Sequence, residues 1–267
     1  MIIASLSTIP DRLDSLLYVL KELKTQSVLP DFIYISLSKF YPRSNKHYPD
    51  VDLNNLKSFL HSYSIPNKLV IYENDIGPVL KLITPLKNID VDHPSIAIDS
   101  SFIFTLDDDT PIYNKTIESL LISHNKNPNA VYAFSGTRED RFFHAELLPE
   151  GYDYFVIDVL GGYRGVLYPL YLFKDKFEFY TWCNTFIVSS KKHGLIAMHD
   201  DHIFSYYFKY KGIPRHLGYC PFTKDFNYTP IQNANGIFND SNNNTSINII
   251  KQTIINQKLD WVVNNPY

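Results

Sequence analysis

The first half of this chain alternates short apolar runs with segments of helical periodicity. The apolar runs are rich in β-branched and aromatic residues, as buried strands are, and lie at residues 2–6, 32–37, 68–72 and 101–106. Helices are expected after these runs, at about residues 13–23, 52–62, from 79 onward and 114–125. Because strands that alternate with helices pair in parallel through right-handed crossovers, we predict an α/β fold with a mostly parallel central sheet flanked by helices.

The second half has a less regular pattern. The elements expected there are strands or turns at residues 131–134, 153–159 and 164–172, a helix at about 200–210, a loop at 233–245 and an amphipathic helix at about 246–258. We find no internal repeat and no clear linker, so we predict a single domain over residues 1–267.

The composition argues against several classes of protein. Lys and Arg number 25 against 28 Asp and Glu, which gives a formal net charge of −3. This charge does not match the basic footprint of a nucleic-acid-binding protein, so no nucleic acid partner is expected. Two cysteines fit a reducing compartment better than a disulfide framework. We also expect no signal peptide and no transmembrane segment, because no apolar stretch approaches the ~20 residues that cross a bilayer. A cytoplasmic protein is expected.

Three consecutive carboxylates, Asp107-Asp108-Asp109, follow the apolar run at residues 101–106. Acids at the C-terminal tip of a buried strand lie where open α/β sheets bind their ligands. Three adjacent carboxylates repel one another unless positive charge lies between them, and hard divalent cations take carboxylate oxygens. The triplet therefore predicts a cation platform that can hold a diphosphate. The alternative is an acidic turn at a strand end.

Two further loops carry groups that suit an anionic ligand. In Asp75-Ile76-Gly77-Pro78-Val79-Leu80-Lys81, Gly and Pro precede a helix whose free N–H groups attract anions, and Lys81 lies one turn inside it. The alternative is an ordinary strand-to-helix loop. The loop Ser7-Thr8-Ile9-Pro10-Asp11-Arg12 leaves the tip of the first strand, where its backbone can bind a base and Arg12 can meet a phosphate or a buried acid.

A second acidic pair, Asp200-Asp201, opens the helix expected at 200–210. Carboxylates at a helix N-terminus interact favourably with its dipole, so capping is one interpretation. The other is that one of the two acts as a general base toward a hydroxyl group. The aromatic run after the pair, residues 203–208, is expected to anchor this helix against the sheet. The glycines of Gly161-Gly162-Tyr163-Arg164-Gly165 either permit close backbone approach to a ligand or shape a turn.

Taken in order, these segments resemble a family of GT-A-fold glycosyltransferases found in bacteria, eukaryotes and large DNA viruses, with the chlorovirus type the nearest relative. The resemblance covers residues 1 to about 215. It rests on the segments at residues 4–12, 26–27, 30–34, 75–78, 81–83, 106–109, 162–168 and 200–207. It implies a Rossmann-like GT-A domain, with a nucleotide-sugar-binding half at about 1–112 and an acceptor-binding half at about 113–267. In a virus, the location implied is the host cytoplasm.

The activity that the resemblance implies is transfer of a sugar from a nucleotide diphosphate sugar, most commonly a UDP-sugar, to a glycan or glycoconjugate hydroxyl, with Mn²⁺ or Mg²⁺. The resemblance implies that Asp201, beside Asp200, is the general base and that the sugar is inverted. It implies metal binding by Asp109, Asp107 and His216. The residues implied to bind the donor are Thr8, Ile9, Pro10, Arg12, Asp75, Gly77, Lys81, Asp107 and Asp108. The chain departs from the usual pattern at Ser7 and at Val79-Leu80 before the lysine.

Two other functions stay open at this point. Haloacid-dehalogenase-like phosphatases use Asp-x-Asp-x-Thr after a strand, but Pro111 stands where that threonine is required. A glycan- or nucleotide-binding module with weak catalysis would need to have lost an acid, yet both acidic clusters are present. The acceptor region is expected at residues 38–51 and 138–184, including Arg138, Trp182 and Asn184.

Overall fold

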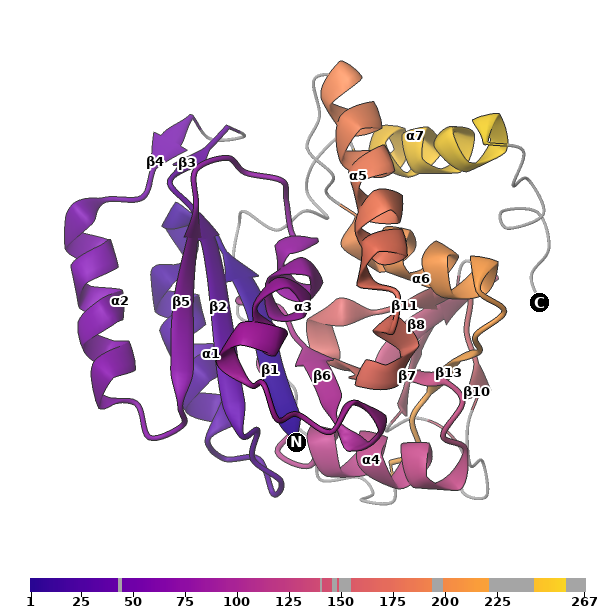
Figure 1. Cartoon of the computed structure of the whole chain (residues 1–267), viewed down its shortest axis with the longest axis horizontal. Coiled ribbons are helices and arrows are strands. Elements are labelled where there is room, and N and C mark those ends of the chain that lie inside the picture. The colour runs from indigo at the N-terminus through magenta and orange to yellow at the C-terminus, as the bar shows by residue number, and fades with distance from the viewer. Residues whose placement is uncertain are drawn as a thin grey trace.

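The computed structural model describes residues 1–42, 45–139, 141–145, 148, 155–193, 199–220 and 243–257. These residues form a sheet of eight strands in the order β10-β13-β7-β12-β6-β1-β2-β5, with helices on both faces (Figure 1). Four of the seven neighbouring strand pairs in this sheet are parallel. The predicted α/β class, with a mostly parallel central sheet flanked by helices, is confirmed.

The first half of the chain supplies the parallel part of the sheet. Its strands are β1 (Ile2–Thr8), β2 (Phe32–Ser38), β5 (Asn67–Tyr72) and β6 (Phe102–Thr105). Its helices are α1 (Leu13–Leu23), α2 (Asp50–Ser62), α3 (Leu80–Asp92) and α4 (Thr116–Lys126). Strand β1 pairs in parallel with β2 on one side and with β6 on the other. Because helices cover both faces, every residue of β1 except Ser7 is buried.

The second half completes the sheet with shorter strands. They are β7 (Val131–Ala133), β10 (Phe155–Val156), β12 (Val166–Pro169) and β13 (Arg215–Leu217). Strand β12 is antiparallel to both of its neighbours, β6 and β7. A separate antiparallel sheet contains β8 (Ser135–Arg138), β9 (Arg141–His144) and β11 (Val159–Leu160). Strands of two to four residues carry little periodicity, so their sequence pattern was weak.

Three parts of the expected secondary structure need correction. The polar loop predicted at 38–51 contains a short hairpin, β3 (Phe40–Tyr41) with β4 (Lys46–His47), and the start of α2. Helix α5 (Lys176–Lys192) was not predicted at all, because its aromatic and β-branched residues favour strands and tertiary packing overrides that preference. Helix α7 (Asn243–Asn256) begins three residues earlier than expected. Most of the loop predicted at 233–245 lies outside the described residues.

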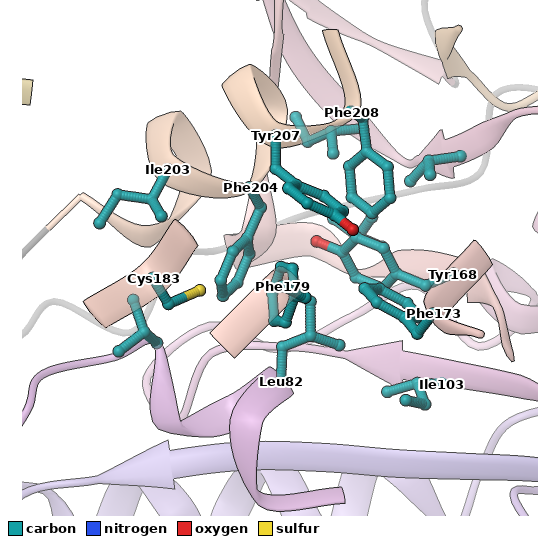
Figure 2. Close-up of a cluster of buried hydrophobic side chains, with 14 of the residues drawn as sticks. Leu82, Ile103, Tyr168, Phe173, Phe179, Cys183, Ile203, Phe204, Tyr207 and Phe208 are labelled. Carbon is teal, nitrogen blue, oxygen red and sulfur yellow. The ribbon is translucent and has the colours of Figure 1, made fainter. Parts of the chain in front are cut away.

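Two apolar cores lie on opposite faces of the sheet. Helices α1, α2 and α4 cover one core. Helices α3, α5 and α6 (Asp200–Tyr210) cover the other, and α7 packs against α5. Figure 2 shows the second core, in which Phe204, Tyr207 and Phe208 of α6 pack among Tyr168 of β12, Phe179 of α5 and their neighbours. The predicted anchoring of α6 by its aromatic run is therefore confirmed. Among the described residues, no helix is long and apolar enough to span a membrane.

Candidate functional site

An open cleft runs along the edge of the sheet at which β1, β2 and β6 end. The residues that line it are Ser7, Thr8, Ile9, Pro10, Arg12, Ser38, Tyr41, Asp75, Gly77, Pro78, Leu80, Asp107, Asp108 and Asp200. All the residues predicted to bind the donor lie on this lining except Lys81. Three parallel strands end here together, and ligands of open α/β sheets bind at this edge.

Arg12 holds two members of the acidic triplet. Its Nη1 atom lies 2.8 Å from Asp108 Oδ1 and 2.9 Å from Asp109 Oδ2. All three side chains are largely buried, with exposed fractions of 12%, 4% and 17%. The guanidinium is fixed by the turn Pro10–Arg12, which follows β1 and leads directly into α1. Arg12 therefore meets buried acids, one of the two roles considered for it from the sequence.

Lys81 holds the third member of the triplet and connects it to α6. Its Nζ atom lies 2.5 Å from Asp107 Oδ1 and 2.7 Å from Asp200 Oδ2. The lysine side chain is only 3% exposed, whereas Asp107 is 33% exposed toward the cleft. The acidic tip of β6 and the acidic start of α6 thus meet on a single buried ammonium group. The positive charge that the triplet requires comes from Lys81 and Arg12.

Gly162 lies against Asp201. Its backbone N–H donates to both carboxylate oxygens of Asp201, at 3.1 Å each. A Cβ atom at Gly162 would lie 2.5 Å from Asp201 Oδ1 and 3.0 Å from Lys81 Nζ. The backbone at this glycine therefore closely approaches a carboxylate and an ammonium of the protein itself, whereas the approach considered from the sequence was to a ligand.

The site contains more negative than positive charge. Five carboxylates, from the triplet and the Asp200-Asp201 pair, are grouped with the cations Arg12 and Lys81. Burial, together with the charges of Asp108 and Asp107, raises the pKa of Asp109 to about 6. Burial and the charge of Asp200 raise the pKa of Asp201 well above its usual value, although Lys81 opposes the shift. Burial lowers the pKa of Lys81, but Asp107 and Asp200 outweigh it and keep the ammonium charged. The cluster therefore favours an additional positive group.

Asp75 marks the opposite end of the cleft. Its Oδ1 atom accepts a hydrogen bond of 2.8 Å from the backbone N–H of Gly77, and Ser38 Oγ lies 3.4 Å away. Gly77 has a φ angle of +84°, in the region that favours glycine. The strand order β6-β1-β2-β5 separates Asp107, after β6, from Asp75, after β5. At ~4.8 Å per strand, the cleft spans about 14 Å, enough for a nucleoside diphosphate.

Two residues expected near the site lie elsewhere. His216 is on β13, buried against the ring of Tyr132, and β13 is three strands from β6. At the usual strand spacing this is about 14 Å from β6, so His216 is not brought to the acidic triplet. Trp182 of α5 is buried, donates from Nε1 to the carbonyl of Ile203 and stacks on Tyr210. It therefore belongs to the core and not to an open acceptor cleft, which corrects that expectation.

Five residues of the lining lie in segments that were predicted to form the site, but they had no individual role assigned to them. These are Ser7, Ser38, Tyr41, Pro78 and Leu80. Ser38 could have been predicted from the strand pattern, because it ends β2, and the ends of parallel strands β1 and β2 meet at the same edge of the sheet. Tyr41 belongs to the β3–β4 hairpin, whose two-residue strands are too short to show a periodic pattern.

The described acidic side chains of the site do not by themselves form a complete metal site. Among the described residues, no three His, Cys, Asp or Glu side chains are arranged to hold a metal ion by themselves. Asp107 is partly exposed to the cleft, and Asp109, two residues later, is 17% exposed. Magnesium-type ions are often held by one or two carboxylates together with substrate phosphates. The donor set thus fits a cation that arrives with a diphosphate.

No family model and no curated protein matches the sequence. Among solved structures, the fold is similar to that of S. aureus TarS residues 1–349 in complex with UDP-GlcNAc, with a TM-score of 0.53 and 11% sequence identity. The match covers 98% of this chain and 69% of that chain. At this identity the likeness concerns the fold alone: nearly the whole chain follows the α/β architecture of a protein crystallised with a nucleotide sugar.

Proposed function

We propose that this protein is a glycosyltransferase that moves a sugar from a nucleotide diphosphate sugar, most simply a UDP-sugar, to a hydroxyl group of a glycan or glycoconjugate. The observation that carries the proposal is the meeting of Asp107 and Asp200 on Lys81 at the edge of the cleft. It joins a candidate diphosphate platform to a helix that begins with candidate bases. The likeness of fold to a protein that holds UDP-GlcNAc supports the same donor class.

The proposed reaction is a single displacement with inversion. The acceptor hydroxyl attacks the anomeric carbon as the bond from that carbon to the diphosphate oxygen breaks, and the nucleoside diphosphate leaves. Asp201 takes the hydroxyl proton. Its raised pKa makes it a stronger base than an ordinary carboxylate, whereas Asp200 is already paired with Lys81. If a divalent cation binds with the diphosphate, Asp107 and Asp109 would hold it, and it would stabilise the negative charge of the leaving group.

In this proposal the chain works as one glycosyltransferase unit. The first half, to about residue 112, binds the donor. The second half supplies the base and the acceptor surface, for which the three-stranded sheet β11-β8-β9 is the candidate because β11 lies directly before Gly161 and Gly162.

The test is a screen of nucleotide sugars for thermal stabilisation with and without Mn²⁺, followed by detection of sugar transfer to an acceptor panel by mass spectrometry. Stabilisation by a nucleotide sugar together with a glycosylated product supports the proposal. If nucleotide sugars do not stabilise the protein but p-nitrophenyl phosphate is hydrolysed, the protein is a phosphatase instead. Donor binding without hydrolysis or transfer would indicate a binding module.

A further inference from the structure

The two acidic partners of Lys81 belong to two different parts of the fold. Asp107 follows β6, in the half of the chain proposed to bind the donor, whereas Asp200 is the first residue of α6. The two contacts, 2.5 Å and 2.7 Å, are short enough for charge-assisted hydrogen bonds. The side chain is nearly inaccessible to solvent. Lys81 is therefore the direct electrostatic connection between the two units.

The geometry argues against the phosphate-binding role expected for Lys81. An ammonium group has three N–H donors, and carboxylates occupy two of the positions around this one. A Cβ atom at Gly162 would lie only 3.0 Å from Nζ, so the backbone closes on the ammonium from that side. The cleft is lined by Leu80 and not by Lys81. The lysine side chain is buried beneath the cleft lining, out of contact with a phosphate bound in the cleft.

Asp201 depends on the same arrangement. It follows Asp200 directly in α6, and its carboxylate is held by the N–H of Gly162, the glycine that also closes on Lys81. A change in the distance between β6 and the start of α6 therefore moves Asp201 relative to anything bound at Asp107. Misplacement of a catalytic group by about 1 Å can reduce a rate about 100-fold.

We propose that Lys81 is a positioning residue for the transfer step: its ammonium ties Asp107 to Asp200 and so sets the place of Asp201 relative to the bound donor. This inference rests on the proposed glycosyltransferase function. It assigns Lys81 to alignment across the cleft and not to donor affinity.

The experiment compares Lys81→Met with wild type. Met matches the length of the lysine side chain but cannot bind two carboxylates. Donor affinity is measured by calorimetry with UDP and Mn²⁺, and kcat and donor KM are measured in the transfer assay. We expect kcat to fall about 100-fold, with UDP affinity and donor KM within about threefold of wild type. The matched control is Lys87→Met, an exposed lysine on the same helix, which should leave all three values unchanged.

Loss of Lys81 leaves two acids without their cation, so Lys81→Met alone can destabilise the fold. The double variant Lys81→Met with Asp200→Asn removes one of these charges and is compared with Asp200→Asn, in which Lys81 can still donate to the amide oxygen. We expect the double variant to transfer at least about tenfold more slowly than Asp200→Asn with equal UDP affinity.

Parallel losses of UDP affinity and transfer would show that Lys81 contacts the donor, and would overturn the positioning role. Unchanged transfer would overturn it as well. If the wild-type protein neither binds nor uses nucleotide sugars, the proposed function itself is wrong, and the role of Lys81 is wrong with it.

Discussion

The backbone N–H of Gly162 points at the carboxylate of Asp201 and lies 3.1 Å from each of its oxygens. No side chain is needed for this contact, because the glycine backbone itself approaches the acid. The pair joins the turn after β11 to the first residues of α6, and so fixes the orientation of the candidate base.

Gly162→Ala tests this contact. The added methyl group would overlap Asp201 Oδ1 at 2.5 Å and press on Lys81 Nζ at 3.0 Å. Overpacking of this kind costs about 1–3 kcal/mol, and we expect transfer to fall about 100-fold while UDP affinity is kept. The control is Gly212→Ala, where nothing lies within 4 Å of the new methyl group and only the φ of +66° is strained. Equal transfer losses in both variants would contradict a local role for Gly162.

Asp201→Asn tests the base. An amide cannot take a proton at neutral pH, so we expect transfer to fall by a factor of about 10²–10⁴ while calorimetry shows unchanged UDP affinity. Asp200→Asn serves as the comparison, because Asp200 is paired with Lys81 and its change should reduce transfer less. A larger loss for Asp200→Asn would assign the base to Asp200, and full turnover of Asp201→Asn would exclude Asp201.

Arg12→Ala tests how the acidic triplet is stabilised. It leaves Asp108 and Asp109 without their cation in a largely buried position, and breaking such a group costs about 3–5 kcal/mol. We expect a loss of about 3 kcal/mol in the free energy of unfolding, measured by urea titration. Lys39→Ala removes the solvent-exposed pair with Glu73 and should change it by less than about 1 kcal/mol. Similar losses for the two variants would argue against a special role for Arg12.

Asp109→Ala tests the proposed cation. We expect UDP binding measured by calorimetry to be stronger with Mn²⁺ than with EDTA in the wild-type protein, and this difference to shrink at least about tenfold in the variant. Because Asp109 also pairs with Arg12, thermal unfolding must first show that the variant is folded. A metal-dependent gain in UDP affinity that survives the substitution intact would remove Asp109 from the cation site.

His202 should make the protein less stable in acid. Burial, with the nearby charges of His199 and Lys251, lowers the pKa of His202 to about 3. Between pH 6.5 and pH 3 the unfolded chain therefore binds a proton that the folded protein does not, and stability falls as the pH falls through this window. We expect His202→Gln to reduce the loss of unfolding free energy between pH 7 and pH 5 by about 1–2 kcal/mol. An identical pH dependence in wild type and variant would contradict this.

The sequence predicted the parallel half of the fold well, because each of its strands contains a run of apolar residues and each is followed by a helix. It predicted part of the cleft lining for the same reason: Thr8 ends β1, and Asp75 and Asp107 follow β5 and β6. Helix α5 was missed, since burial among other aromatic side chains, and not intrinsic preference, makes it helical.

The roles of charged residues were harder to predict than their positions. Lys81 was expected to meet a phosphate, yet in the structure it pairs with Asp200, a residue 119 positions later in the chain. Such a pairing depends on how α6 packs on the sheet, and a local pattern does not contain that information. The position of His216 was hard to predict for a similar reason, because the order of the short strands decides how far β13 lies from β6.

The antiparallel strand β12 has a consequence for protein engineering. It is hydrogen-bonded to β6 of the first half and to β7 of the second, from Val166 opposite Thr105 to Pro169 opposite Phe102. A chimera that takes its second half from a related protein must preserve the pairing of β12 with β6 at each of these residues. If it does not, the side of β6 that β12 now covers becomes a bare strand edge, and bare edges recruit other chains into aggregates.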